Sequence, residues 1–146
     1  FGLTLGKSTL EEVQQRYTLK WKDTSPGLPD NWFSFQLSGD QLNNNKINNA
    51  VLFFDNEQIL GRVLFFFPSS MSVFTDLNTI ISQHYPLVTT PEFEPNANRW
   101  FEHNYQDDKI HIKLIHNMYS TKVTYTVIDY FSRANAQHKA NKDATQ

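Results

Sequence analysis

The chain carries the same order of landmarks twice, and this internal repeat constrains its fold more than any other feature. Two pairs recur at one common spacing, namely Arg16-Tyr17 with His84-Tyr85 and Trp32-Phe33 with Trp100-Phe101. Two apolar segments correspond at a slightly shorter spacing, namely Val51–Asn56 with Ile112–Asn117 and Arg62–Phe65 with Lys122–Tyr125. The sequence therefore predicts one domain over residues 1–146, made of internal repeats at 1–68 and 69–131. The alternative is a chance alignment of two similar strings of elements.

Each half has the pattern of a helix followed by antiparallel strands. A capping box of Ser8 and Glu11 predicts the first helix start, and Leu10, Val13 and Tyr17 follow at helical spacing. The second helix is expected from residue 72 to the proline at 86. Period-two alternation and turn residues predict strands at 19–22, 32–37, 51–54 and 61–67, and then at 87–89, 99–105, 110–116 and 122–130. A short leading strand at 3–5 is a further expectation, and the polar tail at 132–146 is expected to be a frayed helix or a loose tail outside the core.

These elements predict an α+β fold of tandem helix-plus-sheet units, α-β-β-β-β twice. A helix would pack on one face of an antiparallel sheet in each half. The two sheets can join edge to edge into one continuous curved sheet, with both helices on the same face.

The first half is apolar on both faces of its expected sheet, whereas the second half alternates between apolar and polar. Its surplus apolar residues are assigned to the face away from the helix, together with the second tryptophan: Trp32, Leu52, Phe54, Leu64, Phe66 and Trp100. One hypothesis is that these residues form an exposed surface for a partner, because large aromatic side chains dominate contact energy. The alternatives are coverage by the loop at 39–49, by the tail or by the other sheet, and self-association.

Composition excludes several classes of function. Lys and Arg number 13 against 15 Asp and Glu, so the chain lacks the basic surplus of a nucleic-acid binder. No cysteine is present, which removes disulfides and thiolate chemistry. The sequence contains no apolar run near the ~20 residues that a membrane-spanning helix needs. His103, His111 and His116 lack metal-ligand spacing, so no metal and no cofactor is expected. Glu102, His103 and Asp107 form the one cluster that a hydrolytic enzyme would use, and no catalytic arrangement is recognised in it.

The segment Leu3–Val13, which reads Leu-Thr-Leu-Gly-Lys-Ser-Thr-Leu-Glu-Glu-Val, resembles the helix start of bacterial envelope proteins. Among these are the small outer-membrane assembly lipoproteins of the SmpA/OmlA-like group. The doubled helix-plus-sheet plan is also similar to the β-lactamase-inhibitor-protein-like fold. The chain departs from the SmpA/OmlA pattern because no Leu-Gly-x-Pro follows the helix. The resemblance implies a periplasmic or secreted binding module, with its leader removed, whose sheet face engages another protein.

The sequence thus predicts a non-enzymatic protein–protein interaction module that uses an aromatic sheet face, with another protein or a second copy as partner. The alternative is a carrier of a small molecule or lipid. A helix over a phenylalanine-lined sheet can leave an apolar cavity, and the carrier would need one of several hundred Å³.

Overall fold

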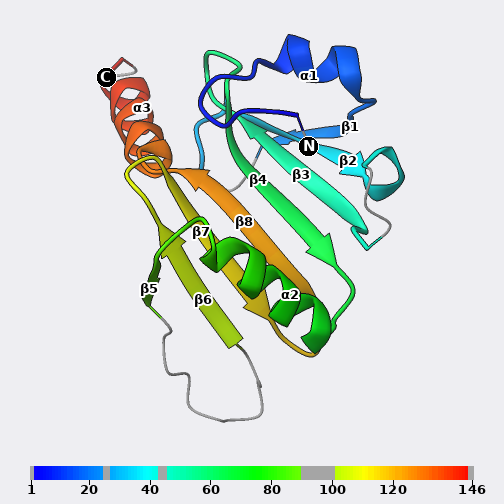
Figure 1. Ribbon diagram of the computed structural model, residues 1–146. Helices are drawn as coiled ribbons and strands as arrows, with labels where there is room; N and C mark the ends of the chain where they lie inside the picture. Colours follow the sequence, from blue (N-terminus) through cyan, green and yellow to red (C-terminus); the bar gives the residue numbers. More distant parts are fainter. Residues whose placement is uncertain (1, 25–26, 43–45, 90–100, 145–146) are drawn as a thin grey trace.

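The protein folds around one antiparallel sheet, as the computed structural model in Figure 1 shows. The structure describes residues 2–24, 27–42, 46–89 and 101–144. Within these residues it has three α-helices and a sheet of eight strands, which confirms the predicted α+β class.

The helix-then-strands order occurs twice along the chain. The first set is α1 (Leu10–Arg16), β1 (Lys20–Thr24), β2 (Phe33–Ser38), the short 3₁₀ helix η1 (Gly39–Gln41), β3 (Asn49–Phe54) and β4 (Leu60–Phe67). The second set is α2 (Met71–Ser82), β5 (Leu87–Thr89), β6 (Phe101–Gln106), β7 (Ile110–His116) and β8 (Thr121–Val127), and α3 (Tyr130–Ala144) follows it. The strand order in the sheet is β1-β2-β3-β4-β8-β7-β6-β5, so the two sets join through β4 and β8.

The joint between β4 and β8 is symmetric about the pair of Leu64 and Thr124. Val63 pairs with Tyr125 and Phe65 pairs with Val123 in an antiparallel register. A twofold rotation about the Leu64–Thr124 pair would therefore exchange the two strands. This is the relation that the predicted correspondence of 62–65 with 122–125 requires, although the duplication itself stays a prediction.

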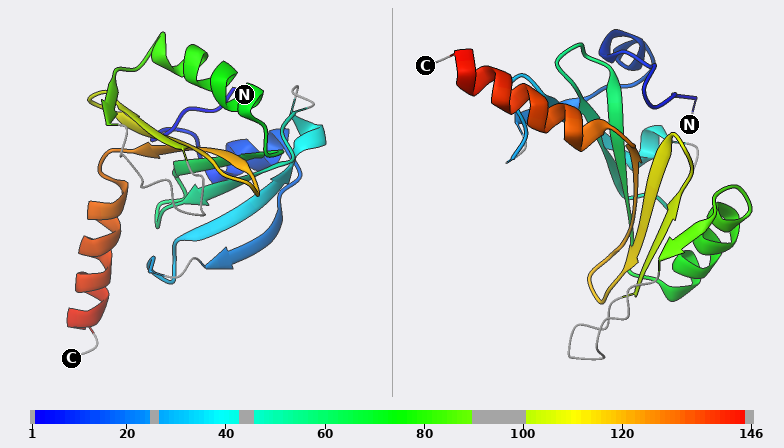
Figure 2. Two further views of the ribbon diagram at one scale, coloured as in Figure 1. Left: turned by 90° about the horizontal axis from the view of Figure 1, so that it is seen from below. Right: turned by 90° about the vertical axis from the view of Figure 1, so that its left-hand side faces the viewer.

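Helices cover both faces of the sheet. α1 and α2 lie on one face and α3 lies on the other, as the edge-on view in Figure 2 shows. Val13 of α1 is buried in one cluster with Leu37, Leu52 and Val63. Phe74 and Ile81 of α2 are buried in a second cluster with strand residues of the second half. The face that carries α1 and α2 therefore holds the main core.

The start of α1 differs from the predicted capping box by one residue. The N-cap is Thr9, whose Oγ1 accepts a hydrogen bond from the backbone N–H of Glu12 at 3.2 Å. The Ser8 hydroxyl oxygen accepts a hydrogen bond from the backbone N–H of Thr4 at 2.8 Å instead. No strand forms at residues 3–5: residues 3 and 4 have no regular structure, and residues 5–7 form a turn in which the N–H of Lys7 donates to the Thr4 carbonyl at 3.1 Å.

The register of β3 overturns part of the predicted face assignment. Leu52 pairs with Val63, so both side chains lie on the face of α1. A register shift beside Phe54, which pairs with Leu60, adds both of these residues to the same core. Placing Leu52 and Phe54 with Leu64 on the open face was therefore wrong, because a shift of one residue moves a whole strand to the other face.

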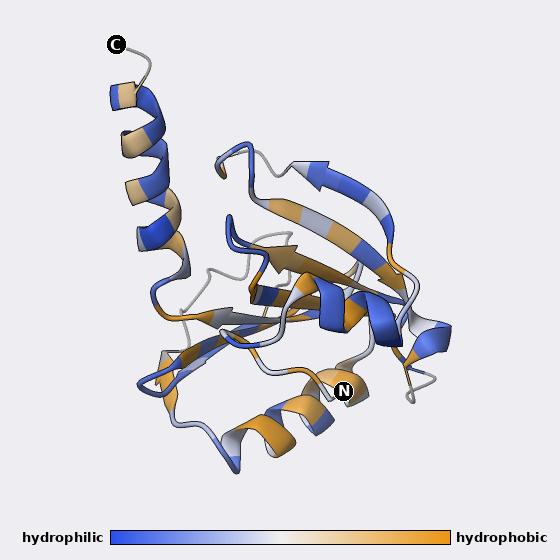
Figure 3. Cartoon of the chain, turned by 90° about the horizontal axis from the view of Figure 1, so that it is seen from above, coloured by the Kyte–Doolittle hydropathy of each residue, from blue (hydrophilic) through white to orange (hydrophobic). Residues whose placement is uncertain are grey.

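The tail after β8 is a helix, one of the two forms expected, but it packs on the sheet, contrary to the expectation that it lies outside the core. Tyr130 and Ala134 of α3 are buried against Trp32 and Phe53. Arg133 also donates a hydrogen bond from Nη1 to Oδ2 of the buried Asp55 at 2.7 Å. Figure 3 shows that most of α3 is hydrophilic, so only its first turns contribute to the core.

Candidate functional site

Half of the residues predicted for the aromatic surface are buried. Trp32 is 1% exposed, Leu52 0% and Phe54 1%. Trp32 does lie on the face opposite α1, as predicted, but α3 covers it, with the rings of Trp32 and Tyr130 5.1 Å apart. These three side chains are not available to a partner in this structure. Burial also raises the pKa of the neighbouring Tyr130 to about 12.

Leu64 and Phe66 remain on the face opposite α1 and α2 and are half-buried there. Leu64 packs at the border of the cluster that holds Trp32, and Phe66 lies farther along β4. The structure therefore brings Trp32 and Leu64 together and separates both from Leu52 and Phe54. Trp100 lies outside the described residues.

The cluster considered for hydrolysis does not converge on one point. His103 lies beneath α2, where its Nδ1 is 2.9 Å from Oδ1 of Asn78, and burial lowers its pKa. Glu102 points to the other face and accepts a hydrogen bond from Asn104 at 3.0 Å. The carboxylate of Asp107 accepts hydrogen bonds from backbone N–H groups of its own turn. Within the described ranges no group of three His, Asp or Glu side chains is arranged to hold a metal ion.

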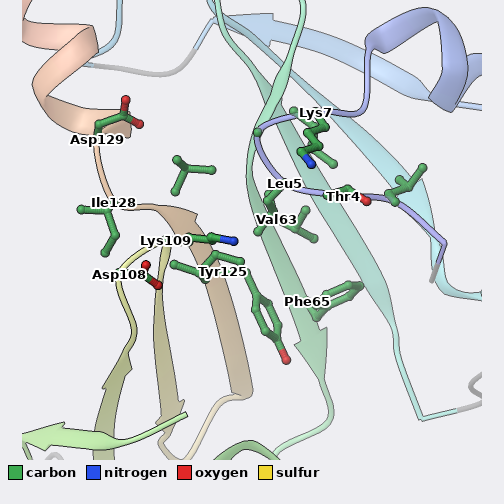
Figure 4. A pocket seen from close by; sticks show the side chains of 15 residues that line it. Thr4, Leu5, Lys7, Val63, Phe65, Asp108, Lys109, Tyr125, Ile128 and Asp129 are labelled. Carbon is green, nitrogen blue, oxygen red and sulfur yellow. The ribbon is translucent and has the colours of Figure 1, made fainter. Parts of the chain in front are cut away.

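A cavity of about 810 Å³ lies on the helix-bearing face, over the joint between the two halves of the sheet. Figure 4 shows its floor, which is built by Val63 and Phe65 of β4 and by Tyr125 of β8. The rings of Phe65 and Tyr125 meet edge to face with centroids 6.1 Å apart. The remaining apolar lining comes from the N-terminal segment and from the ends of strands: Leu3, Leu5, Leu60, Ile110, Val127 and Ile128.

One wall of the cavity is the segment before α1. Gly6 adopts a left-handed conformation with φ of +82°, and its N–H donates to the Leu60 carbonyl at 2.7 Å. The N–H of Leu60 donates in turn to the Ser8 carbonyl at 2.8 Å. These two hydrogen bonds hold residues 3–7 across the start of β4, with the side chain of Lys7 at the rim.

The opposite wall is the turn between β6 and β7. Oδ1 of Asp107 accepts hydrogen bonds from the N–H groups of Lys109 and Ile110, both at 2.8 Å, which lowers the pKa of Asp107. The N–H of Ile128 donates to the Lys109 carbonyl at 3.0 Å and ties the turn to the end of β8. The turn is therefore ordered, and it presents Lys109 to the cavity.

Four charged residues are among the described residues that line the cavity: Lys7, Asp108, Lys109 and Asp129. Lys7 and Lys109 extend their ammonium groups inward from opposite walls, as Figure 4 shows. Asp108 and Asp129 lie to the outer side, beside Ile128. Asp129 accepts from Nε of Arg133 at 3.2 Å, so its charge is already paired.

Sequence reasoning missed the residues of both walls. Gly6 and Lys7 were noted only within the segment Leu3–Val13 before the first helix, and Asp107 only within the cluster considered for hydrolysis. The sequence signal was a glycine next to a lysine before a helix, which is too common to indicate a cavity.

Comparison with known proteins found no matching family model, no matching curated protein and no matching solved structure. The resemblance to bacterial envelope proteins therefore stays a prediction. No helix in the described part of the chain is long and apolar enough to cross a membrane.

Proposed function

We propose that the protein is a non-enzymatic binding protein that holds an apolar small molecule or lipid in the cavity between its N-terminal segment and its sheet. The observation that carries this proposal is the cavity itself. Its volume of about 810 Å³ falls within the range of about 300–1,000 Å³ that is typical of ligand sites.

The lining supports an apolar ligand. Leu5, Val63, Ile110 and the two rings of the floor offer aliphatic and aromatic surface, and the charged side chains stand at the edge. Such a site gains free energy by removing apolar ligand surface from water, at about 25 cal/mol per Å². The hydrogen bonds that fix both walls mean that little of this gain is spent on ordering the protein.

The test uses the absence of cysteine in the chain. Ile110→Cys places one thiol in the cavity lining, and Ile115→Cys places a matched thiol on the other face of the same strand. We expect the neutral probe N-phenylnaphthylamine to fluoresce on binding and to slow maleimide labelling at 110 but not at 115. Equal labelling rates with and without the probe at both positions would contradict the proposal.

A second candidate function is the predicted protein–protein interaction, now limited to fewer surface residues than the sequence indicated. Leu64, Phe66 and Ile115 are half-buried on the face opposite α1 and α2. In Figure 2, α3 does not extend over the β6 and β7 end of that face. We propose contact with another protein or a second copy at these residues, in a periplasmic or secreted setting, as the alternative function.

A further inference from the structure

We propose that the ligand of the cavity is an anionic amphiphile, a single acyl chain whose anionic head group lies between Lys7 and Lys109. This inference rests on the proposed function and names the class of ligand. It follows from the two lysines, from the state of the nearby carboxylates and from the position of the two floor rings.

Two lysines reach into the cavity from different segments. Their side chains start from different segments, the turn before α1 and the turn before β7, and both reach inward over the floor in Figure 4. Neither ammonium forms an ion pair with a carboxylate among the described residues. Two ammonium groups at one cavity supply up to six N–H donors and no acceptor, so the complementary group is an anion.

The nearby acidic residues lie on the outer side of the cavity or in the turn that holds Lys109. Asp129 is bound to Arg133, whereas Asp107, whose Oδ1 accepts hydrogen bonds from its own turn, also attracts the charge of Lys109. Asp108 is the remaining carboxylate of the lining, and in Figure 4 it lies with Asp129 on the outer side. A head group entering between the lysines therefore meets positive charge first, although the whole chain has a formal charge of −2.

The apolar floor continues away from the lysines along β4 and β8. Val63 lies near the two ammonium groups, and the rings of Phe65 and Tyr125 lie farther along the strands in Figure 4. A chain attached to the head group would run over Val63 and end against these rings. Polar contact at one end and apolar contact along the rest describe an amphiphile with one charged terminus.

The experiment compares three ligands of equal chain length and different head charge: decanoate, decanol and decyltrimethylammonium. Each displaces N-phenylnaphthylamine from the intact protein, and the midpoint of displacement gives its affinity. We expect decanoate to bind about tenfold more tightly than decanol, since hydrogen bonds to charged groups are the strong ones. We expect the cation to bind most weakly.

The variant K7Q/K109Q should lose the preference for decanoate and keep the affinity for decanol. K113Q/K122Q is the matched control, because it removes two lysines from the opposite face of the sheet. Lys7 and Lys109 are exposed, so folding is preserved, and circular dichroism checks this.

Two results separate the failure of this inference from that of the proposed function. Equal affinity for decanoate and decanol, or a preference that persists in K7Q/K109Q, would overturn the anionic head group and leave an apolar site. If N-phenylnaphthylamine does not bind and none of the three ligands binds, both proposals are overturned.

Discussion

At the scale of single residues, Asp55 connects the sheet to α3. Its side chain is 1% exposed. Oδ1 accepts from the N–H groups of Glu57 and Ile59, at 2.9 and 3.0 Å, and so shapes the turn between β3 and β4. Oδ2 accepts from Arg133 of α3. One carboxylate therefore fixes both a turn and the position of a helix.

We expect Asp55→Asn to lower the free energy of unfolding by about 1–2 kcal/mol, because a hydrogen bond to a charged group is lost while Arg133 stays partly solvated. Asp129→Asn is the control. It removes the other carboxylate that contacts Arg133, and the side chain of Asp129 is 58% exposed. The free energy of unfolding should therefore fall by less than about 0.5 kcal/mol. Urea unfolding measures both, and equal losses would show that burial of Asp55 does not matter.

The N-cap of α1 and the sheet face of Leu52 were each predicted wrongly by one position along the chain. Thr9 rather than Ser8 caps α1, because Ser8 is already engaged by the backbone of Thr4. Leu52 faces α1 rather than the open side, because it pairs with Val63. Both choices depend on contacts between segments that are distant in sequence, and alternation within one strand does not contain them.

At the scale of elements, α3 shows how a weak pattern can still contribute to a core. The helix has only two fully buried side chains, Tyr130 and Ala134. Trp32 supplies the large apolar surface from the sheet side, and Arg133 adds the contact to Asp55. A polar helix is thus held mainly by its first turns, and His138 adds a contact of 2.9 Å from Nε2 to the Gly27 carbonyl oxygen.

We expect Ala134→Asp to detach α3, because it places an unpaired carboxylate against Trp32 and Phe53. The free energy of unfolding should fall by more than about 2 kcal/mol, and tryptophan emission should shift to the red. Ala136→Asp is the matched control, because Ala136 is exposed on the same helix. Similar spectra for the two variants would mean that α3 does not depend on this contact.

The strands and the first two helices were predictable, whereas the packing of α3 on the sheet was not. Alternation such as Ile110, Ile112 and Leu114 is strong, and β7 has the predicted bounds, Ile110–His116. Residues 132–144 lack a repeating apolar stripe, and their helix is stabilised by surface that Trp32 offers from elsewhere in the chain. Tertiary contact, rather than local pattern, decided this element.

At the scale of the whole molecule, the cavity arises from how the two sets of elements meet. α1 and α2 pack toward separate clusters, so neither covers the joint of β4 and β8. The N-terminal segment and the turn before β7 then approach from either side. The sequence predicted a cavity between helix and sheet only as an alternative. A local sequence pattern does not indicate how much space two packed elements leave between them.

The two faces of β4 serve the two proposed functions, so variants on each face should act independently. Val63 and Phe65 line the cavity, and Phe66 points to the opposite face. We expect Phe66→Asp to leave binding of N-phenylnaphthylamine unchanged. If copies associate through the open face, sedimentation of the concentrated wild-type protein shows a dimer that Phe66→Asp removes, since a carboxylate would have to be buried in the interface.

Ile110→Trp is the reciprocal variant, because its indole fills the cavity and should reduce probe binding without changing sedimentation. Loss of probe binding in Phe66→Asp would contradict this independence and would mean that the sheet transmits changes between its faces.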